Sequence, residues 1–200
     1  MTRKVETLAA WYALPSRINQ SDLAGLSAVP HTPADIYRWV YDHGGAEVIR
    51  TERRIVFQGP DEPVVITGIR AIILERKPSL CGGFLGTGLG GTTVPLKASL
   101  DLDSPAPSAP EFGDKVINLA PGEQATLDLT ATALRSTVTW DLGVAYTIGG
   151  QAQEMILHAD TLHFRTTGQA GSTSADLLPE PSRYYESVAW DELSGYVLQP

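Results

Sequence analysis

The sequence predicts a mainly β fold, an antiparallel two-sheet β-sandwich preceded by a short N-terminal helical segment. Hydrophobic and polar residues alternate through much of residues 47–168, which is the pattern of strands with one buried and one solvated face. Stretches rich in glycine and proline separate these segments, as turns between strands do. Seven or eight strands at this spacing are typical of a sandwich.

Residues 1–46 form the predicted helical segment. A hydrophobic residue at every third or fourth position from Val5 to Tyr12 predicts a first helix, which Pro15 ends. A second short helix is expected from Ser21, as its N-cap, through Leu26.

The strongest helix pattern follows, in the stretch "HTPADIYRWVYDHGG". Thr32 stands where an N-cap belongs and Pro33 occupies the first helical position. Ile36 and Val40 share one face, and Gly44 supplies a left-handed stop.

The predicted strands of the sandwich, which spans residues 47–168, follow in order. Two central glycines in "IGGQ" predict a tight hairpin turn between two of the strands. Segments with strand patterning lie near residues 47–57, 64–75, 94–102, 125–133, 138–148, 154–158 and 161–166.

Residues 169–200 are predicted to be a linker and an aromatic C-terminal segment. Residues 169–182 have a linker-like composition. The last stretch is too aromatic for a terminal segment that makes no contacts, since it contains Tyr184, Tyr185, Trp190 and Tyr196. We expect that stretch to dock on the sandwich or on a partner.

The charge and the cysteine content of the chain limit the partners and the cellular location that we expect for it. The net charge is −8 and the pI is about 4.9, so nucleic acid and anionic membranes are disfavoured as partners. One cysteine allows no internal disulfide. Neither a secretory signal nor a membrane span is evident in the sequence, so a cytoplasmic location without direct membrane insertion is expected.

Gly86, Gly88 and Gly91 have the G-x-G-x-x-G spacing of a dinucleotide-binding turn. That turn opens onto a helix, whose N-terminus holds the pyrophosphate. Here an alternating segment, "TTVPLKASLDLD", follows instead, so no cofactor is expected. The tract is interpreted as a long loop between strands, and loops of this length are often functional.

No metal site or catalytic residue is predicted. His158 and His163 are separated by an odd number of residues, so a single straight strand would turn them to opposite faces. The lone Cys81 has no identifiable histidine partner. The acidic residues of the strands are assigned to solvated outer faces: Asp101, Asp103, Asp128 and Asp141.

Two alternatives for function stay open. Residues 18–45 weakly resemble a degenerate helix-turn-helix, which would make the chain a DNA-binding regulator, although an acidic chain argues against it. Exposed Trp or Tyr side chains on the sandwich would instead suit a small-molecule or carbohydrate site.

The order of several β segments resembles a family of uncharacterised actinobacterial β-rich proteins across roughly residues 39–168. The resemblance implies an immunoglobulin-like sandwich and carries no known activity. In many members the corresponding domain follows transmembrane helices and is assigned to the outside of the cytoplasm, whereas no such helix precedes it here. The matching segments are "VVITGIRAIILERKP", "CGG", "LDLDSPAP", "LAPGEQATLDLTATA", "VTWDLGVAYTIGG" and "LHFRTTG".

Taken together, the sequence favours a non-enzymatic module that binds another protein. Sheet edges, end loops and apolar patches are the surfaces through which sandwiches bind. The expected contact regions are the loops at residues 81–92 and 104–114 and the aromatic C-terminal segment. The candidate contact residues are Cys81, Phe84, Leu85, Leu89, Tyr184, Tyr185, Trp190 and Tyr196.

Overall fold

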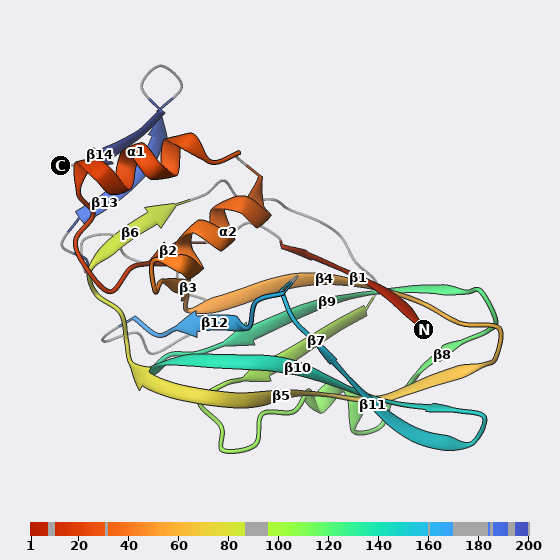
Figure 1. Ribbon diagram of the computed structural model, residues 1–200. Coiled ribbons are helices and arrows are strands. Elements are labelled where there is room, and N and C mark those ends of the chain that lie inside the picture. Colours follow the sequence, from red (N-terminus) through yellow and green to blue (C-terminus); the bar gives the residue numbers. More distant parts are fainter. Residues whose placement is uncertain are drawn as a thin grey trace.

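A computed structural model shows a mainly β protein with two sheets and two α-helices (Figure 1). It describes residues 1–7, 11–30, 32–86, 96–159, 161–169, 184, 186–191 and 195–199. A mainly β fold is therefore confirmed. Among these residues, no helix has the length and hydrophobicity needed to cross a bilayer.

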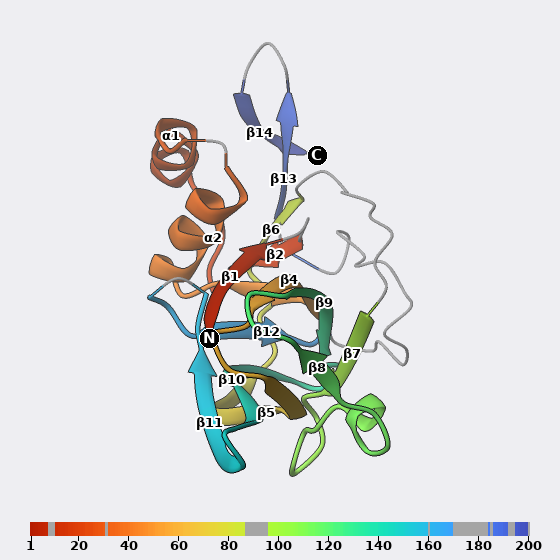
Figure 2. The same ribbon diagram turned by 90° about the vertical axis from the view of Figure 1, so that its right-hand side faces the viewer.

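The smaller sheet has four strands in the order β1-β4-β9-β7 (Figure 2). β1 and β4 pair antiparallel, as do β4 and β9, and β7 joins β9 in parallel. The bounds are β1 (Thr2–Thr7), β4 (Arg50–Gln58), β7 (Leu96–Asp101) and β9 (Gln124–Thr132).

The larger sheet has ten strands. Their bounds are β2 (Trp11–Ala13), β3 (Ala46–Val48), β5 (Val64–Pro78), β6 (Gly83–Gly86), β8 (Ile117–Leu119), β10 (Ser136–Ile148), β11 (Gln151–Leu157), β12 (Phe164–Thr167), β13 (Glu186–Asp191) and β14 (Gly195–Gln199). Their order is β14-β13-β6-β2-β3-β12-β10-β5-β8, with β11 also pairing with β10.

The main core lies between the two sheets. Alternate residues of β4 point inward, among them Ile55 and Phe57 from the smaller sheet. Trp140 and Phe164 face these two residues from the larger sheet. The rings of Trp140 and Phe164 stack on each other, with centroids 4.6 Å apart. All four belong to one continuous hydrophobic cluster, so burial of apolar surface holds the layers together.

The predicted antiparallel pairing holds for most neighbouring strands, but both sheets are mixed. β7 pairs in parallel with β9, β3 with β12, and β6 with β13. Each of these pairs joins strands that are far apart in the chain. No hairpin turn fixes their relative direction, whereas a tight hairpin makes its two strands antiparallel.

The predicted helix from Val5 to Tyr12 is wrong. The described residues of this region form strand β1, which pairs with β4 from Thr2↔Gln58 to Thr7↔Arg53, and strand β2. Pairing with strands elsewhere in the chain has overridden the local helical spacing, which is a weak indicator over so short a segment. The N-terminal region therefore contributes to both sheets.

The two other predicted helices form. α1 (Gln20–Ala28) begins after Asn19, rather than Ser21, and Asn19 and Asp22 make a reciprocal capping box. α2 (Pro33–Asp42) has Thr32 as its N-cap, as predicted. Gly44 follows with φ of 74°, the left-handed conformation that suits glycine. Trp39 and Val40 face the core from α2.

The "IGGQ" hairpin is confirmed between β10 and β11. Gly149 and Gly150 have φ values of 55° and 76°, as a two-residue turn of type I′ requires. At the other end of the chain, β13 and β14 form a second hairpin that joins the larger sheet through β6. The described part of the aromatic C-terminal segment is therefore built into the fold, with Tyr184, Val188 and Tyr196 buried.

Candidate metal centre

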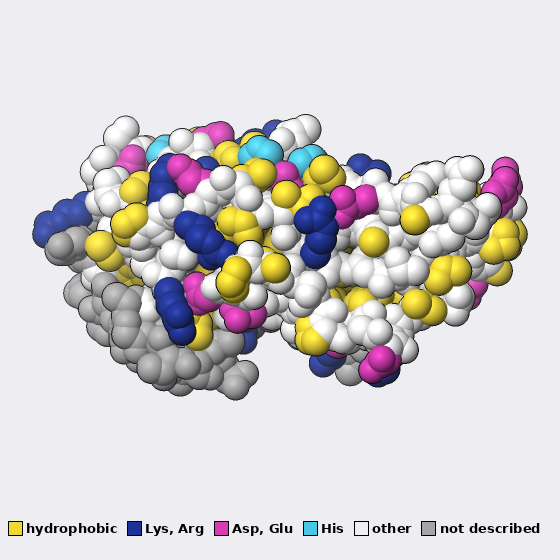
Figure 3. Space-filling model, turned by 90° about the horizontal axis from the view of Figure 1, so that it is seen from below, with side chains coloured by type: hydrophobic (Ala, Val, Ile, Leu, Met, Phe, Trp, Pro, Cys, Tyr) yellow, Lys and Arg dark blue, Asp and Glu magenta, His cyan; other side chains and the backbone are white. Residues whose placement is uncertain are grey.

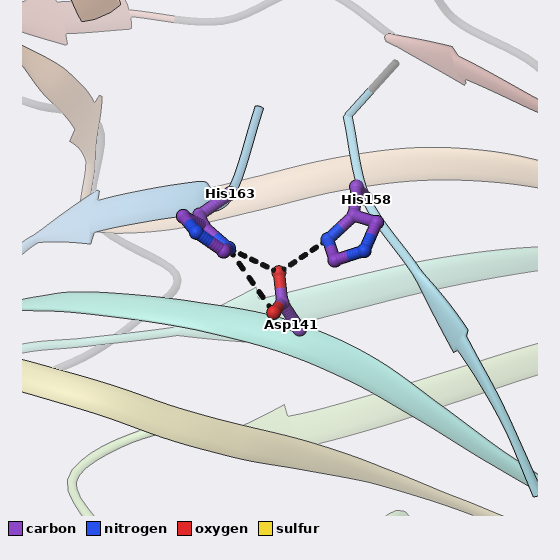
Figure 4. Close-up of side chains that lie close together, drawn as sticks. All are labelled: Asp141, His158 and His163. Atoms are coloured by element: carbon purple, nitrogen blue, oxygen red, sulfur yellow. Dashed lines mark hydrogen bonds and ion pairs between the residues drawn. The ribbon is translucent and has the colours of Figure 1, made fainter. Parts of the chain in front are cut away.

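The pairing register of β10 brings two histidines beside one aspartate. β5 covers one edge of β10, so β11 and β12 share the other edge. β11 pairs with residues 142–148 and β12 with residues 137–140, which leaves Asp141 between them. His158 directly follows β11 and His163 directly precedes β12. Both histidines therefore lie opposite Asp141 (Figure 4).

A short closed loop connects the two histidines. Ala159 and Leu162 form an isolated antiparallel bridge, with N–H···O distances of 2.9 Å in both directions. The chain thus leaves the edge of β10 after His158 and returns to it at His163, with both residues beside Asp141. The odd separation of the histidines does not put them on opposite faces, because the strand is interrupted between them.

The three side chains converge through specific atoms. The Nδ1 atoms of His158 and His163 lie 2.8 and 2.9 Å from Oδ1 of Asp141. Nδ1 of His163 also lies 3.1 Å from Oδ2. The two rings meet edge to face, with centroids 5.6 Å apart. An ionised carboxylate can only accept hydrogen bonds, so each Nδ1–H donates to Asp141 in this arrangement.

The carboxylate is buried and the imidazoles reach the surface. The Asp141 side chain is 8% exposed, whereas those of His158 and His163 are 38% and 46% exposed. Figure 3 shows histidine side chains at the surface beside acidic and hydrophobic ones. The cluster is therefore accessible from solvent through its nitrogen ligands.

Asp141 lacks a strong cationic partner. Within the described ranges, its ion-pair partners are the two histidines, and no lysine or arginine pairs with it. Burial of a carboxylate is costly unless an opposite charge or hydrogen bonds compensate. Hydrogen bonds from His158 and His163 compensate the burial here, and a cation held between the three side chains would take their place.

The loop is anchored from α2 by a buried phenol. The Tyr37 hydroxyl donates to the backbone carbonyl of His163 at 2.9 Å. Burial raises the pKa of Tyr37, and the negative charge of Glu47 raises it further, so the phenol keeps its proton and stays a donor at neutral pH. A cavity of about 200 Å³ adjoins this anchor and is lined by α2, β1 and the loop residues Ala159 and Leu162.

The spacing of the ligand atoms fits a transition-metal ion. One nitrogen from each histidine and one oxygen from Asp141 all lie within 4.8 Å of one another. Zinc bonds of about 2.0–2.2 Å at tetrahedral angles would place such atoms about 3.3 Å apart. The N···O separations of 2.8–3.1 Å in the hydrogen-bonded form need to widen by only about 0.2–0.5 Å, and two partly exposed rings can move that far.

The structure corrects the interpretation of Asp141 and the two histidines. Asp141 is buried rather than on a solvated face. The prediction that His158 and His163 face apart is wrong because it assumed one continuous strand. One feature of the sequence could have indicated the cluster. Segments 154–158 and 161–166 are both short enough to share one edge of the longer 138–148 strand.

The other acidic residues of the strands do not converge. Asp128 accepts from Arg54 at 3.0 Å. Asp103 accepts from the backbone N–H of Leu134 at 2.8 Å, and Asp101 accepts from the N–H of Asp103 at 3.0 Å. These carboxylates hold neighbouring strands and turns in place.

Several of the candidate contact residues that the structure describes are buried. Phe84 and Tyr184 pack together with ring centroids 5.1 Å apart, in a small second hydrophobic cluster. Leu85 and Tyr196 belong to the main core, so these four side chains are covered by their own fold. Cys81 is exposed. Leu89, Tyr185 and the side chain of Trp190 lie outside the described residues.

The glycine tract is described only up to Gly86, which ends β6. Residues 87–95 lie outside the described residues, so the prediction of a partner-contacting loop there stays a prediction.

Comparison of the chain with protein-family models, with curated proteins and with solved structures found no match. Function is therefore inferred from the geometry of this site.

Proposed function

We propose that the protein binds one divalent transition-metal ion through Asp141, His158 and His163. The observation that carries this proposal is the convergence of two imidazole nitrogens on one buried carboxylate, with all three ligand atoms within 4.8 Å. Charge neutralisation of Asp141 favours a cation, and the surface position of the rings gives the ion a route of entry.

The ligand types select the class of ion. Imidazole nitrogen suits zinc, iron, copper and nickel, whereas calcium and magnesium prefer oxygen ligands alone. Two histidines and one carboxylate form the ligand set of several zinc sites and of non-haem iron(II) sites, which keep further coordination positions for water or another ligand. We therefore propose an ion with exchangeable positions that face solvent.

Metal binding requires a change of tautomer at both histidines. The Nδ1 atoms donate protons to Asp141 in the hydrogen-bonded form, and a metal ligand needs the lone pair at that nitrogen. The proton can be carried by the other ring nitrogen, Nε2, because both rings are partly exposed to water. Acid weakens binding, because protons compete with the ion for the same nitrogens.

Isothermal titration calorimetry with zinc chloride tests the proposal. We expect one ion per chain in the wild type, and an affinity at least about tenfold lower in His163→Ala, since even outer-shell changes cost that much at metal sites. His43→Ala is the matched control, because His43 is an exposed histidine that stacks on Trp39 away from the cluster. Equal zinc affinity in the wild type and His163→Ala would contradict the proposal.

The protein-binding role predicted from the sequence stays a second proposal, with a different surface. The buried aromatic and leucine side chains named above do not offer a contact surface in the chain alone. The edge of β7 does offer one, because β9 is its described neighbour on one side alone. Neither proposal requires catalytic turnover, and the expectation that the chain is not an enzyme stays a prediction.

The two sequence alternatives find less support. Trp39 and Trp140 are buried, which removes two of the four tryptophans from any carbohydrate platform. On α2, the helix that would enter a DNA groove, the exposed charged side chains are Arg38 and Asp42, which offset each other. DNA binding and carbohydrate binding stay predictions, as do the immunoglobulin-like topology, the actinobacterial family and the cytoplasmic location.

A further inference from the structure

Among the strands that the structure describes, β7 is at the edge of the smaller sheet, with β9 on one side (Figure 2). In a parallel pair, alternate residues direct their N–H and C=O groups toward the neighbouring strand. The N–H of Leu102 donates to the carbonyl of Thr132 at 2.8 Å, so the even-numbered residues bond toward β9. Lys97, Ser99 and Asp101 therefore direct their backbone groups to the open edge.

One side chain occupies that edge in place of a strand. The N–H of Ser99 donates to Oε2 of Glu111 at 3.2 Å. Glu111 lies in η1 (Pro110–Phe112), a short 3-10 helix beside β7. A carboxylate oxygen thus stands where the carbonyl of a neighbouring strand would accept, and a strand that adds to β7 must displace it.

Two hollows follow the same edge, one on each side of this contact. The first, of about 490 Å³, lies beside Leu96 and Lys97 and is completed by Glu111, Phe112, Lys115 and Val116. The second, of about 520 Å³, lies beside Ser99, Leu100 and Asp101. A chain extended along β7 would pass both hollows, which are placed to receive its side chains.

The first hollow is apolar with a basic rim. Leu96 and Val116 are 37% and 49% exposed and are two of the few large hydrophobic residues at the surface. Lys97 and Lys115 stand at the same hollow in a chain whose net charge is −8. If Glu111 is displaced, Lys97 and Lys115 lie opposite the incoming chain. Their positive charges favour an acidic peptide.

We propose that the edge of β7 binds an extended, acidic and apolar peptide segment of another protein as an added strand. Peptide carbonyls accept from the N–H groups of Lys97 and Ser99, and Glu111 moves aside. An apolar side chain enters the hollow at Leu96 and Val116, and an acidic one meets Lys115. This inference is independent of the metal site, because it uses the other sheet and different residues.

Fluorescence anisotropy with a labelled nine-residue peptide of alternating valine and glutamate tests the inference on the full chain. We expect micromolar binding that weakens with salt. Lys97→Pro should abolish it, because proline removes an outward N–H that the ladder with β9 does not use, and edge strands tolerate such a proline. Lys97→Ala is the matched control, which loses the same side chain but keeps the N–H, so it should lose only the contribution of the charge and bind more tightly than Lys97→Pro.

Two surface variants keep the test decisive if Lys97→Pro fails to fold. Lys115→Glu should weaken binding at least about tenfold, and Glu111→Ala should strengthen it severalfold by freeing the N–H of Ser99. No peptide binding by the wild type, or equal binding by Lys97→Pro and Lys97→Ala, would overturn the inference. Concentration-dependent dimers that Lys97→Pro abolishes would also overturn it, since the occupant would then be a second copy of this chain.

Discussion

Arg53 and Glu47 form an ion pair that is completely shielded from solvent. Nη1 and Nη2 of Arg53 each donate to a different oxygen of Glu47 at 2.8 Å, and neither side chain has any exposure. The guanidinium lies between the rings of Tyr37 and Phe164, 5.1 and 5.4 Å from their centroids. Thr51 donates a further hydrogen bond to Glu47 at 2.7 Å. The pair thus links β3, β4 and α2 at one end of the core.

Loss of one partner of this pair should destabilise the fold strongly. Arg53→Ala leaves a buried, uncompensated carboxylate, and such changes cost about 3–5 kcal/mol. Urea unfolding followed by circular dichroism measures the loss. The double variant Glu47→Leu with Arg53→Met removes both charges and should cost less than Arg53→Ala alone. A double variant that is less stable than Arg53→Ala would contradict this account of the pair.

Stability should fall steeply in alkali because Tyr12 and Tyr37 are buried. Burial raises the pKa of both phenols, and the negative charge of Glu47 adds to the rise. Tyrosine in the unfolded chain ionises near pH 10. Above that pH the unfolded state loses its protons first, so the free energy of unfolding falls by up to about 1.4 kcal/mol per pH unit for each phenol.

Urea unfolding at a series of pH values between about 9 and 11 measures this slope. The stabilisation is fully present below the pKa of the unfolded chain and is lost as pH rises toward the pKa of the folded chain. Tyr37→Phe should show a shallower fall than the wild type. Parallel stability curves for the two proteins would show that Tyr37 does not contribute.

Tyr37→Phe also tests the anchor of the histidine loop. The variant removes the hydrogen bond to the carbonyl of His163 and should lower the free energy of unfolding at neutral pH by about 1 kcal/mol. Zinc affinity should fall as well, because the position of His163 becomes less fixed. Tyr146→Phe is the control, since its hydroxyl donates to Gln153 at an exposed site. An unchanged zinc affinity in Tyr37→Phe would show that the anchor does not position the ligand.

Gly143 in β10 and Gly168, which directly follows β12, should differ sharply in their tolerance of alanine. A Cβ at Gly168 would lie 2.3 Å from the backbone carbonyl of Leu134, whereas one at Gly143 would lie 2.8 Å from the flexible end of Glu154. We expect Gly168→Ala to cost about 1–3 kcal/mol or more and Gly143→Ala distinctly less. Thermal unfolding of both variants provides the comparison, and equal costs would contradict the close approach at Gly168.

Local patterns predicted the parts of the fold that depend on neighbouring residues. The cap of α2 and the turn between β10 and β11 need only a few adjacent side chains, and both form as expected. β1 and the parallel pairing of β7 with β9 depend on contacts between distant segments. Such contacts leave no reliable trace in local periodicity.

The candidate metal centre was missed for the same physical reason. Asp141 and the two histidines meet only because β11 and β12 share one edge of β10 and the chain loops out between them. Spacing along the sequence says nothing about an interrupted strand. The pairing register, once known, places all three residues side by side.

The proposed binding of one transition-metal ion by Asp141, His158 and His163 should be visible in a crystal grown with zinc and measured at the zinc absorption edge. We expect one anomalous peak at about 2.0–2.2 Å from Nδ1 of each histidine and from an oxygen of Asp141. A map with no peak at these three residues, or with its zinc bound elsewhere on the chain, would contradict it.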